Sequence, residues 1–142
     1  MVGIVIAGHG QFATGLLSSL RLIAGDFENV AAVDFEMQNS IEDLSKKLGQ
    51  AVQSFTNCDK VIFFTDLAGG SPFRCSVLEG RKTAECKVIA GTNLPMVLEV
   101  LFARDSLEPE ALQQLALATG KQGIQCFADE AKERQKTGTA GI

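Results

Sequence analysis

Short runs of consecutive apolar residues alternate with amphipathic stretches along this chain, and this alternation restricts its fold more than any other feature. The runs cover residues 2–7, 30–35, 60–65 and 87–90. A strand that is apolar at nearly every position is typical of a sheet covered on both faces. Strands that alternate with helices predict an α/β fold, here a doubly wound parallel sheet with helices on both faces.

The stretches between the first three runs carry apolar side chains at helical spacing, together with signals for helix ends. Residues 11–24 form the first predicted helix, and Gly25 stops it. Ser40 and Asp43 resemble a capping box at the start of the second helix. These signals assign each stretch to one helix that connects two strands.

Proline and glycine mark the helix ends in the second half of the chain. Ser71 is a good N-cap and Pro72 suits the first helical position, so a helix is predicted to begin there. Pro95 lies near the start of the next helix, which extends to about residue 104. A last helix covers residues 109–119, with Gly120 as its predicted stop.

The chain of 142 residues fits one domain. Residues 1–130 are expected to form this domain, which includes a short fifth strand at residues 124–127. Residues 131–142 are expected to be a flexible tail, because the last of them are small and polar.

Composition excludes several function classes. A net charge of -4 argues against nucleic-acid binding, which needs clustered Lys and Arg, and the chain has no Trp or Tyr to stack on bases. With one His and no CxxC pair, neither a metal site nor a cofactor is expected. No apolar stretch is long enough to cross a membrane, so we expect a cytoplasmic protein.

Cysteines are widely spaced in this chain. In a cytoplasmic protein they are expected to be free thiols, buried or half-buried, and not disulfides. They are Cys58, Cys75, Cys86 and Cys126.

Three predicted loops follow the carboxyl ends of strands and carry polar or glycine residues. They cover residues 8–10, 66–71 and 91–93. In an open α/β sheet, sites form at this edge, where the strand order reverses. If the first, third and fourth strands are neighbours, these three loops converge on one crevice.

His9 is the only histidine of the chain and stands between two glycines. Its position after a strand alone favours an incidental role, but the flanking glycines let the backbone approach a partner closely. Asp66, at the end of the third strand, either caps its own turn or accepts a hydrogen bond from one ring nitrogen of His9. In the second case it fixes the tautomer and makes the other nitrogen a better nucleophile.

Gly69, Gly70 and Ser71 precede a predicted helix, where backbone N–H groups and a hydroxyl favour anion binding. An ordinary flexible turn with a helix cap explains the same residues. The GK[ST] sequence of a P-loop is missing, and so are GxGxxG after the first strand and a GxSxG elbow. One histidine beside an anion site fits phosphoryl transfer through a phosphohistidine, which needs little else from the protein.

Three segments together resemble enzyme IIA of the mannose-type sugar phosphotransferase system. They are IVIAGHG at residues 4–10, TDLAGGSPF at residues 65–73 and VIAGTNLPM at residues 88–96. The resemblance extends into residues 98–105 and covers roughly residues 2–128 in the same order and spacing.

This resemblance implies a phosphotransferase in which His9 accepts a phosphoryl group from the carrier protein HPr and passes it to an enzyme IIB. It implies that Asp66 pairs with His9, and that Gly69, Gly70 and Ser71 lie at the phosphoryl group. It also implies a homodimer in which residues 124–127 are exchanged and lie antiparallel on the partner sheet. The membrane subunits IIC and IID are then reached only indirectly.

The chain departs from the family pattern at a few positions. Ala68 is small where relatives often carry a bulky residue, and Gln11 stands where some have an aromatic one. No IIB domain follows, so enzyme IIB is expected to be a separate protein. The sequence of residues 9–13 and the Gly-Ile terminus are slightly closer to the N-acetylgalactosamine/galactosamine branch than to the mannose branch.

Two other functions stay open at this point. The phosphotransferase subunit of a dihydroxyacetone kinase has a similar fold and histidine, although its relatives usually carry Ser where this chain has Gly10. A non-catalytic binding module of flavodoxin-like shape is disfavoured, because the chain has no Trp or Tyr to stack on a flavin.

Overall fold

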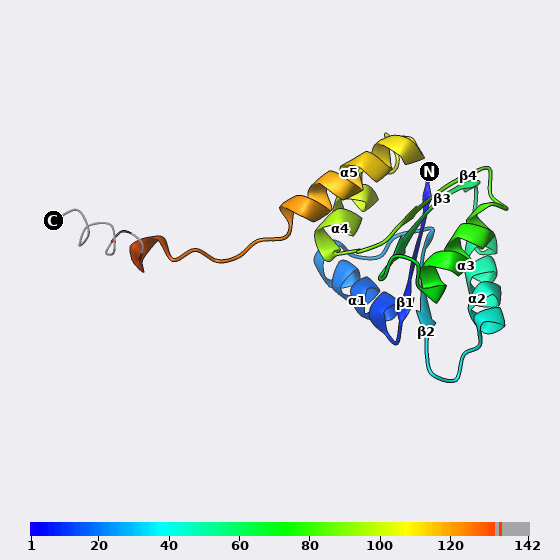
Figure 1. Cartoon of the computed structure of the whole chain (residues 1–142). Helices are drawn as coiled ribbons and strands as arrows, with labels where there is room; N and C mark the ends of the chain where they lie inside the picture. Colours follow the sequence, from blue (N-terminus) through cyan, green and yellow to red (C-terminus); the bar gives the residue numbers. More distant parts are fainter. Residues whose placement is uncertain (133, 135–142) are drawn as a thin grey trace.

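A four-stranded sheet lies at the centre of the chain in the computed structural model, which describes residues 1–132 and 134 (Figure 1). All neighbouring strands are parallel, as predicted. The strand order across the sheet is β2 (Val30–Phe35), β1 (Gly3–His9), β3 (Lys60–Thr65) and β4 (Glu85–Ile89).

Helices cover both faces of the sheet, which confirms the doubly wound arrangement (Figure 1). One face carries α1 (Phe12–Ala24), α4 (Leu94–Ala103) and α5 (Pro109–Gln122). The other face carries α2 (Ile41–Gln53) and α3 (Ser71–Gly80). The capping box predicted for α2 is present, since Asp43 N–H donates to Ser40 Oγ and Ser40 N–H donates to Asp43 Oδ2.

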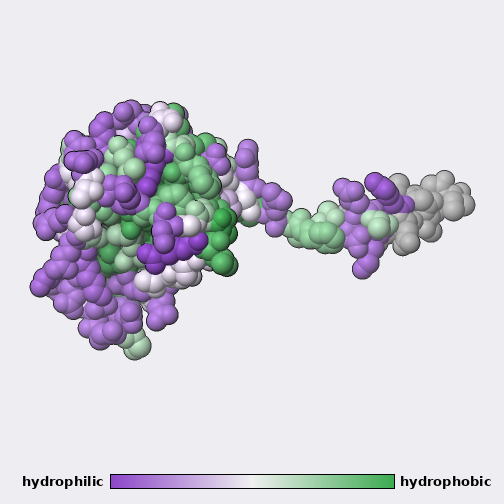
Figure 2. Space-filling model, turned by 180° about the vertical axis from the view of Figure 1, so that it is seen from behind, coloured by the Kyte–Doolittle hydropathy of each residue, from purple (hydrophilic) through white to green (hydrophobic). Residues whose placement is uncertain are grey.

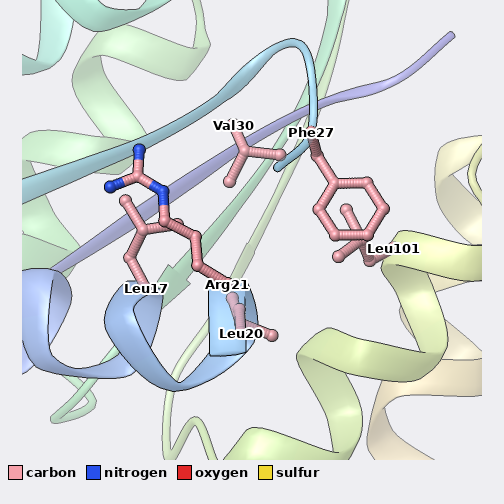
Figure 3. Close-up of a pocket in the computed structure, with 6 residues that line it drawn as sticks. All are labelled: Leu17, Leu20, Arg21, Phe27, Val30 and Leu101. Atoms are coloured by element: carbon pink, nitrogen blue, oxygen red, sulfur yellow. The ribbon is translucent and has the colours of Figure 1, made fainter. Parts of the chain in front are cut away.

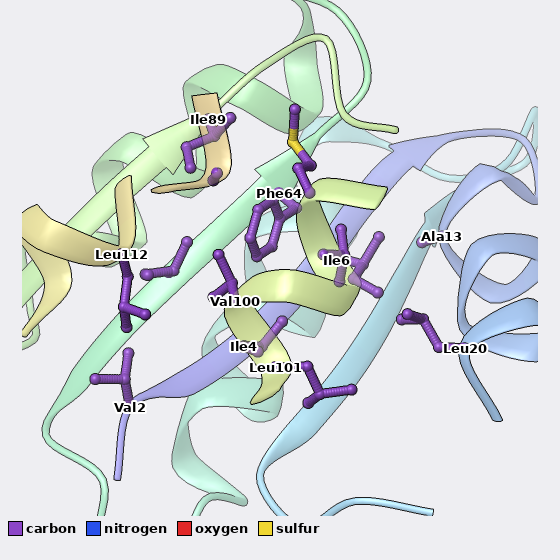
Figure 4. Close-up of a cluster of buried hydrophobic side chains, with 14 residues drawn as sticks. Val2, Ile4, Ile6, Ala13, Leu20, Phe64, Ile89, Val100, Leu101 and Leu112 are labelled. Atoms are coloured by element: carbon purple, nitrogen blue, oxygen red, sulfur yellow. The ribbon is translucent and has the colours of Figure 1, made fainter. Parts of the chain in front are cut away.

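Two apolar layers, one on each side of the sheet, follow from the alternation of side chains along the strands. In β1, Ile4 and Ile6 point to the layer beneath α1, α4 and α5, whereas Val5 and Ala7 point to the layer beneath α2 and α3. Figure 4 shows the first layer, in which α4 lies directly over β1 and β3. Because both faces are covered, β1 is buried over its first six residues.

The central position of β1 creates the switch point. The chain passes from β1 to the β2 side through α1, and then crosses back to β3 through α2 on the opposite face. The carboxyl ends of β1 and β3 therefore lie side by side, with β4 next to β3. This meets the condition under which the three predicted loops converge.

Two predicted helix ends are wrong. The N-cap of α3 is Gly70 and not Ser71, which is the first helical residue. Gly120 does not stop α5, which continues to Gln122 with Gly123 as its C-cap. A Cβ atom at Gly120 would lie 2.4 Å from Met96 Cε, so this glycine allows α5 to pack closely on α4.

The predicted fifth strand is absent from the described chain. Residues 124–127 are extended and lead away from the body after α5 (Figure 1), and Ile124 and Phe127 are 78% and 87% exposed. A strand needs a neighbour to pair with, and the path after Gly123 carries this segment away from the sheet of its own chain. In the predicted tail, residues 133 and 135–142 lie outside the described residues.

The four cysteines are all free, as predicted, but Cys126 is exposed and not buried or half-buried. Among the described residues, no helix combines the length and the apolar character that crossing a membrane requires.

Candidate functional site

The sequence placed His9 in a predicted loop, but in the structure it is the last residue of β1. It pairs in register with Phe35, the last residue of β2, and the two rings meet edge to face at 5.9 Å between centroids. Gly10 then turns the chain with a φ of 58°, and its N–H donates to the Phe35 carbonyl at 2.7 Å. This left-handed turn is why glycine suits the position.

Asp66 contacts His9 from the neighbouring strand. Its Oδ2 atom lies 2.7 Å from His9 Nδ1 and 2.8 Å from the His9 backbone nitrogen, and its Oδ1 accepts from the Leu67 N–H at 2.8 Å. An ionised carboxylate only accepts hydrogen bonds, so the ring proton of a neutral His9 belongs on Nδ1. Nε2 is left with its lone pair, on a side chain that is 45% exposed.

The charge of Asp66 is stabilised by its surroundings. Burial of the carboxyl opposes ionisation, but hydrogen bonds from the His9 backbone and ring and from the Leu67 backbone outweigh it and lower the pKa of Asp66. The carboxylate is therefore ionised at neutral pH and can balance positive charge on the imidazole ring.

The loop after β4, residues 91–93, hydrogen-bonds to the backbone on both sides of Asp66. Gly91 N–H donates to the Asp66 carbonyl at 2.8 Å, and Thr92 Oγ donates to the Thr65 carbonyl at 2.7 Å. Both carbonyls that flank the Asp66 Cα are thus fixed. The Thr92 hydroxyl proton is used in this contact, so Gly91 and Thr92 hold the backbone that carries the carboxylate and Thr92 does not offer a free donor to the crevice.

The N-terminus of α3 lies against the imidazole ring. A Cβ atom at Gly70 would lie 3.1 Å from His9 Cε1, so only glycine leaves the ring its present room. Gly69 has a φ of 75°, which again favours glycine. Ser71 begins the helix, and among the described residues its hydroxyl makes no hydrogen bond to another group. First-turn N–H groups and a free hydroxyl form an environment that favours an anion.

The end of β2 also belongs to this site, although the sequence analysis did not include it. Phe35 contacts the His9 ring, and Asp34 accepts two hydrogen bonds from Thr14 in the first turn of α1. The same rule that selected the other loops would have found these residues, because β2 ends at the same edge of the sheet.

A small hollow in the surface of the described chain lies away from His9. Figure 3 shows it between α1, the start of β2 and α4, lined mainly by apolar side chains such as Leu20, Val30 and Leu101. Its free volume of about 10 Å³ matches a single water and not an aromatic cofactor. Within the described residues, no cluster of three His, Cys, Asp or Glu side chains is arranged to hold a metal ion.

Comparison with known proteins shows the family of this chain. The model of the EIIA-man family, described as "PTS system fructose IIA component", matches residues 3–117. The fructose-specific EIIA component of Bacillus subtilis is 32% identical over 137 residues, which cover 96% of this chain and 93% of that protein.

Two further matches come from a longer protein and from a solved structure. The mannose-specific EIIAB component of Escherichia coli is 34% identical over 135 residues, and the match spans 94% of this chain but only 42% of the relative. The crystal structure of an EIIA component from Streptococcus agalactiae is 34% identical, with a TM-score of 0.81 and coverage of 89% of this chain and 98% of that one. The chain belongs to the mannose-type family of EIIA components of the sugar phosphotransferase system.

Proposed function

We propose that this chain is a cytoplasmic phosphocarrier in which His9 accepts a phosphoryl group from phosphorylated HPr and passes it to an enzyme IIB during sugar uptake. The observation that carries the proposal is the 2.7 Å contact between His9 Nδ1 and Asp66 Oδ2. It leaves Nε2 unprotonated on a half-exposed side chain, whose Cε1 atom lies against Gly70 at the N-terminus of α3.

The transfer is an in-line displacement between two imidazole rings. The Nε2 lone pair of His9 forms a bond to phosphorus while the N–P bond of the donor phosphohistidine breaks and its electron pair returns to the donor ring. The His9 ring keeps its Nδ1 proton and becomes positively charged, and the Asp66 carboxylate balances that charge. Transfer to enzyme IIB is the same displacement with His9 as the leaving group.

Gly69, Gly70 and Ser71 would bind the phosphoryl oxygens. The Ser71 hydroxyl and the first-turn N–H groups of α3 directly follow Gly70, which lies against the His9 ring. Donors fixed in advance stabilise the charge that spreads over these oxygens in the transition state. The catalytic residues of the proposal are accordingly His9, Asp66 and Ser71.

The test is phosphorylation with phosphoenolpyruvate, enzyme I and HPr, followed by intact-mass spectrometry. One acid-labile phosphoryl group is expected on the wild type and none on His9→Ala. Label on His9→Ala would refute the assignment. Release of the label to an enzyme IIB supports the sugar system, whereas release only to a dihydroxyacetone kinase would support that alternative.

The homodimer with exchanged segments is also a proposal. Two features support it: Ile124 and Phe127 are exposed on a segment that leaves the body, and among the described residues no strand pairs with the outer side of β4. Figure 2 shows further apolar surface on the body near the point where this segment departs. Light scattering should give a dimer for the full chain and a monomer after deletion of residues 124–142; a deletion variant that stays dimeric would contradict the exchange.

The sugar is not determined by this site, because an EIIA contacts carrier proteins and not the sugar. Relatives named above carry fructose or mannose in their descriptions. The N-acetylgalactosamine/galactosamine branch stays a prediction. It is tested by measuring which sugar is transported by the IIC and IID subunits encoded in adjacent genes when this chain supplies the phosphoryl group.

A further inference from the structure

The first turn of α1 is capped from a distant strand and not by the residue that precedes it. Gln11 is the N-cap, but its side chain makes no capping hydrogen bond. Instead, Thr14 N–H donates to Asp34 Oδ1 at 3.0 Å, and Thr14 Oγ donates to Asp34 Oδ2 at 2.7 Å. Thr14 is the third helical residue, whose N–H a local cap would normally bind. Asp34 of β2 takes over that role.

This cap lies directly beside His9. Only Gly10 and Gln11 separate His9 from α1, and Gly10 N–H is bound to the Phe35 carbonyl at 2.7 Å. The turn after His9 is therefore attached to the end of β2 at two points, through Gly10 and through Thr14. Between them the turn has little packing of its own, because Gln11 is exposed and nothing lies within 4 Å of a Cβ atom built at Gly10.

We propose that Asp34 is a positioning residue for His9: by holding α1 against the end of β2, it fixes the turn that sets the direction of the His9 ring. Asp66 fixes one ring nitrogen from β3, and Asp34 fixes the backbone that carries the ring from β2. The inference rests on the proposed function of His9 as phosphoryl acceptor. Small displacements of a nucleophile are costly, because in-line attack tolerates little misalignment.

A set of variants separates the effect of the Thr14–Asp34 hydrogen bonds from the effect of the Asp34 charge. Asp34→Ala removes both hydrogen bonds. Asp34→Asn keeps an oxygen for Thr14 N–H and places an amide against Thr14 Oγ, so it preserves the attachment and removes the charge. Thr14→Val removes only the hydroxyl bond. Ser40→Ala is the matched control, because it removes the cap of α2, whose Asp43 N–H to Ser40 Oγ distance is 3.0 Å.

The measurements are the rate of phosphoryl transfer from phospho-HPr and the 15N spectrum of the His9 ring in the unphosphorylated protein. We expect Asp34→Ala to lower kcat by about tenfold with KM little changed, and to reduce the fraction of the Nδ1–H tautomer. Asp34→Asn should stay within about twofold of the wild type, and Thr14→Val should fall between the two. Ser40→Ala should lower Tm but leave rate and spectrum unchanged.

Three results would overturn the inference. Asp34→Ala with a wild-type rate and spectrum would show that the attachment is dispensable. Asp34→Asn as slow as Asp34→Ala would assign the effect to charge and not to position. An equal loss in Ser40→Ala would show that any weakened helix slows transfer. If the wild type accepts no phosphoryl group, the proposed function fails, while the 15N spectra still test the link between Asp34 and His9.

Discussion

A charged side chain lies at each end of the parallel strands, and the two have opposite roles. The carboxyl edge below is the side of the sheet where the strands end, and the amino edge is the side where they begin. At the carboxyl ends of the strands, Asp66 Oδ2 contacts His9 Nδ1 on a half-exposed side chain, and the proposed function uses the other ring nitrogen, Nε2. At the amino edge, the Arg104 guanidinium is 4% exposed and donates to three backbone carbonyls, those of Val2, Glu28 and Asn29. Both groups join distant segments, but only the first holds a side chain that has a lone pair to offer in the proposed function. This difference distinguishes a site from a structural clamp.

The amino edge should therefore affect stability alone. Arg104→Ala leaves the Val2 and Glu28 carbonyls without this donor, whereas the Asn29 carbonyl still accepts from Ile4 N–H. The loss of a hydrogen bond to a buried carbonyl (Val2) and to a partly buried one (Glu28), together with the lost side-chain packing, predicts a loss of about 3 kcal/mol in the free energy of unfolding.

Urea unfolding measures this loss, and Arg81→Ala, at an exposed arginine, is the control that should change stability by less than about 0.5 kcal/mol. At a temperature where the variant is folded, phosphoryl transfer should match the wild type. Slower transfer by folded Arg104→Ala would mean that the two edges are coupled.

The carboxyl edge should show the reverse pattern. Asp66→Ala removes the partner of His9 Nδ1, so the ring samples both tautomers and loses the charge that balances its phosphorylated form. We expect transfer to slow by about 100-fold while the fold persists. Stopped-flow measurement of the transfer from phospho-HPr gives the rate, and circular dichroism checks the fold. Unchanged kinetics in a folded variant would remove Asp66 from the mechanism.

Close packing at the ring gives a smaller effect. In Gly70→Ala the new Cβ would lie 3.1 Å from His9 Cε1, so the ring must shift by a few tenths of an ångström. We expect transfer to slow by about tenfold. Gly15→Ala is the matched control, since nothing lies within 4 Å of a Cβ there and the substitution should favour helix α1. Equal rates in both variants would show that the ring has more room than this distance implies.

The two edges also differ in how far the sequence revealed them. The alternation of apolar runs and helices predicted the parallel sheet, and the loop rule brought His9 and Asp66 to one crevice, because both signals are local. The loop rule also covers the end of β2, but the capping role of Asp34 was missed because it depends on Thr14 across the β2–α1 contact. Arg104 lies in the segment 98–105 to which the resemblance extends, but the sequence assigned it no role, because its partners are backbone carbonyls and carry no side-chain signature. Gly120 was misread because its reason is Met96 on another helix.

A pH dependence follows from Asp66. Its folded-state pKa is lowered, so its contribution to stability is present above the unfolded-state value of about 3.9 and is lost as pH falls through the lower folded-state pKa. The wild type should be more stable than Asp66→Asn at pH 7, and the gap should close under acid conditions. Urea unfolding at several pH values measures it; a gap that stays open below the folded-state pKa of Asp66 would contradict the sign.

The smallest effect is expected at a polar group that belongs to neither edge. Ser76 Oγ is buried and, within the described residues, has no hydrogen-bond partner, whereas Thr65 Oγ is equally buried and donates to the Ile89 carbonyl at 2.8 Å. A buried hydroxyl without a partner costs free energy, so Ser76→Ala should be neutral or stabilise the fold by up to about 1 kcal/mol. Thr65→Val should instead cost about 1 kcal/mol, because it removes a buried hydrogen bond. Thermal unfolding of the two variants measures this difference. If Ser76→Ala destabilises the fold as much as Thr65→Val, then the Ser76 hydroxyl has a hydrogen-bond partner in solution, and its burial does not mean that it is unpaired.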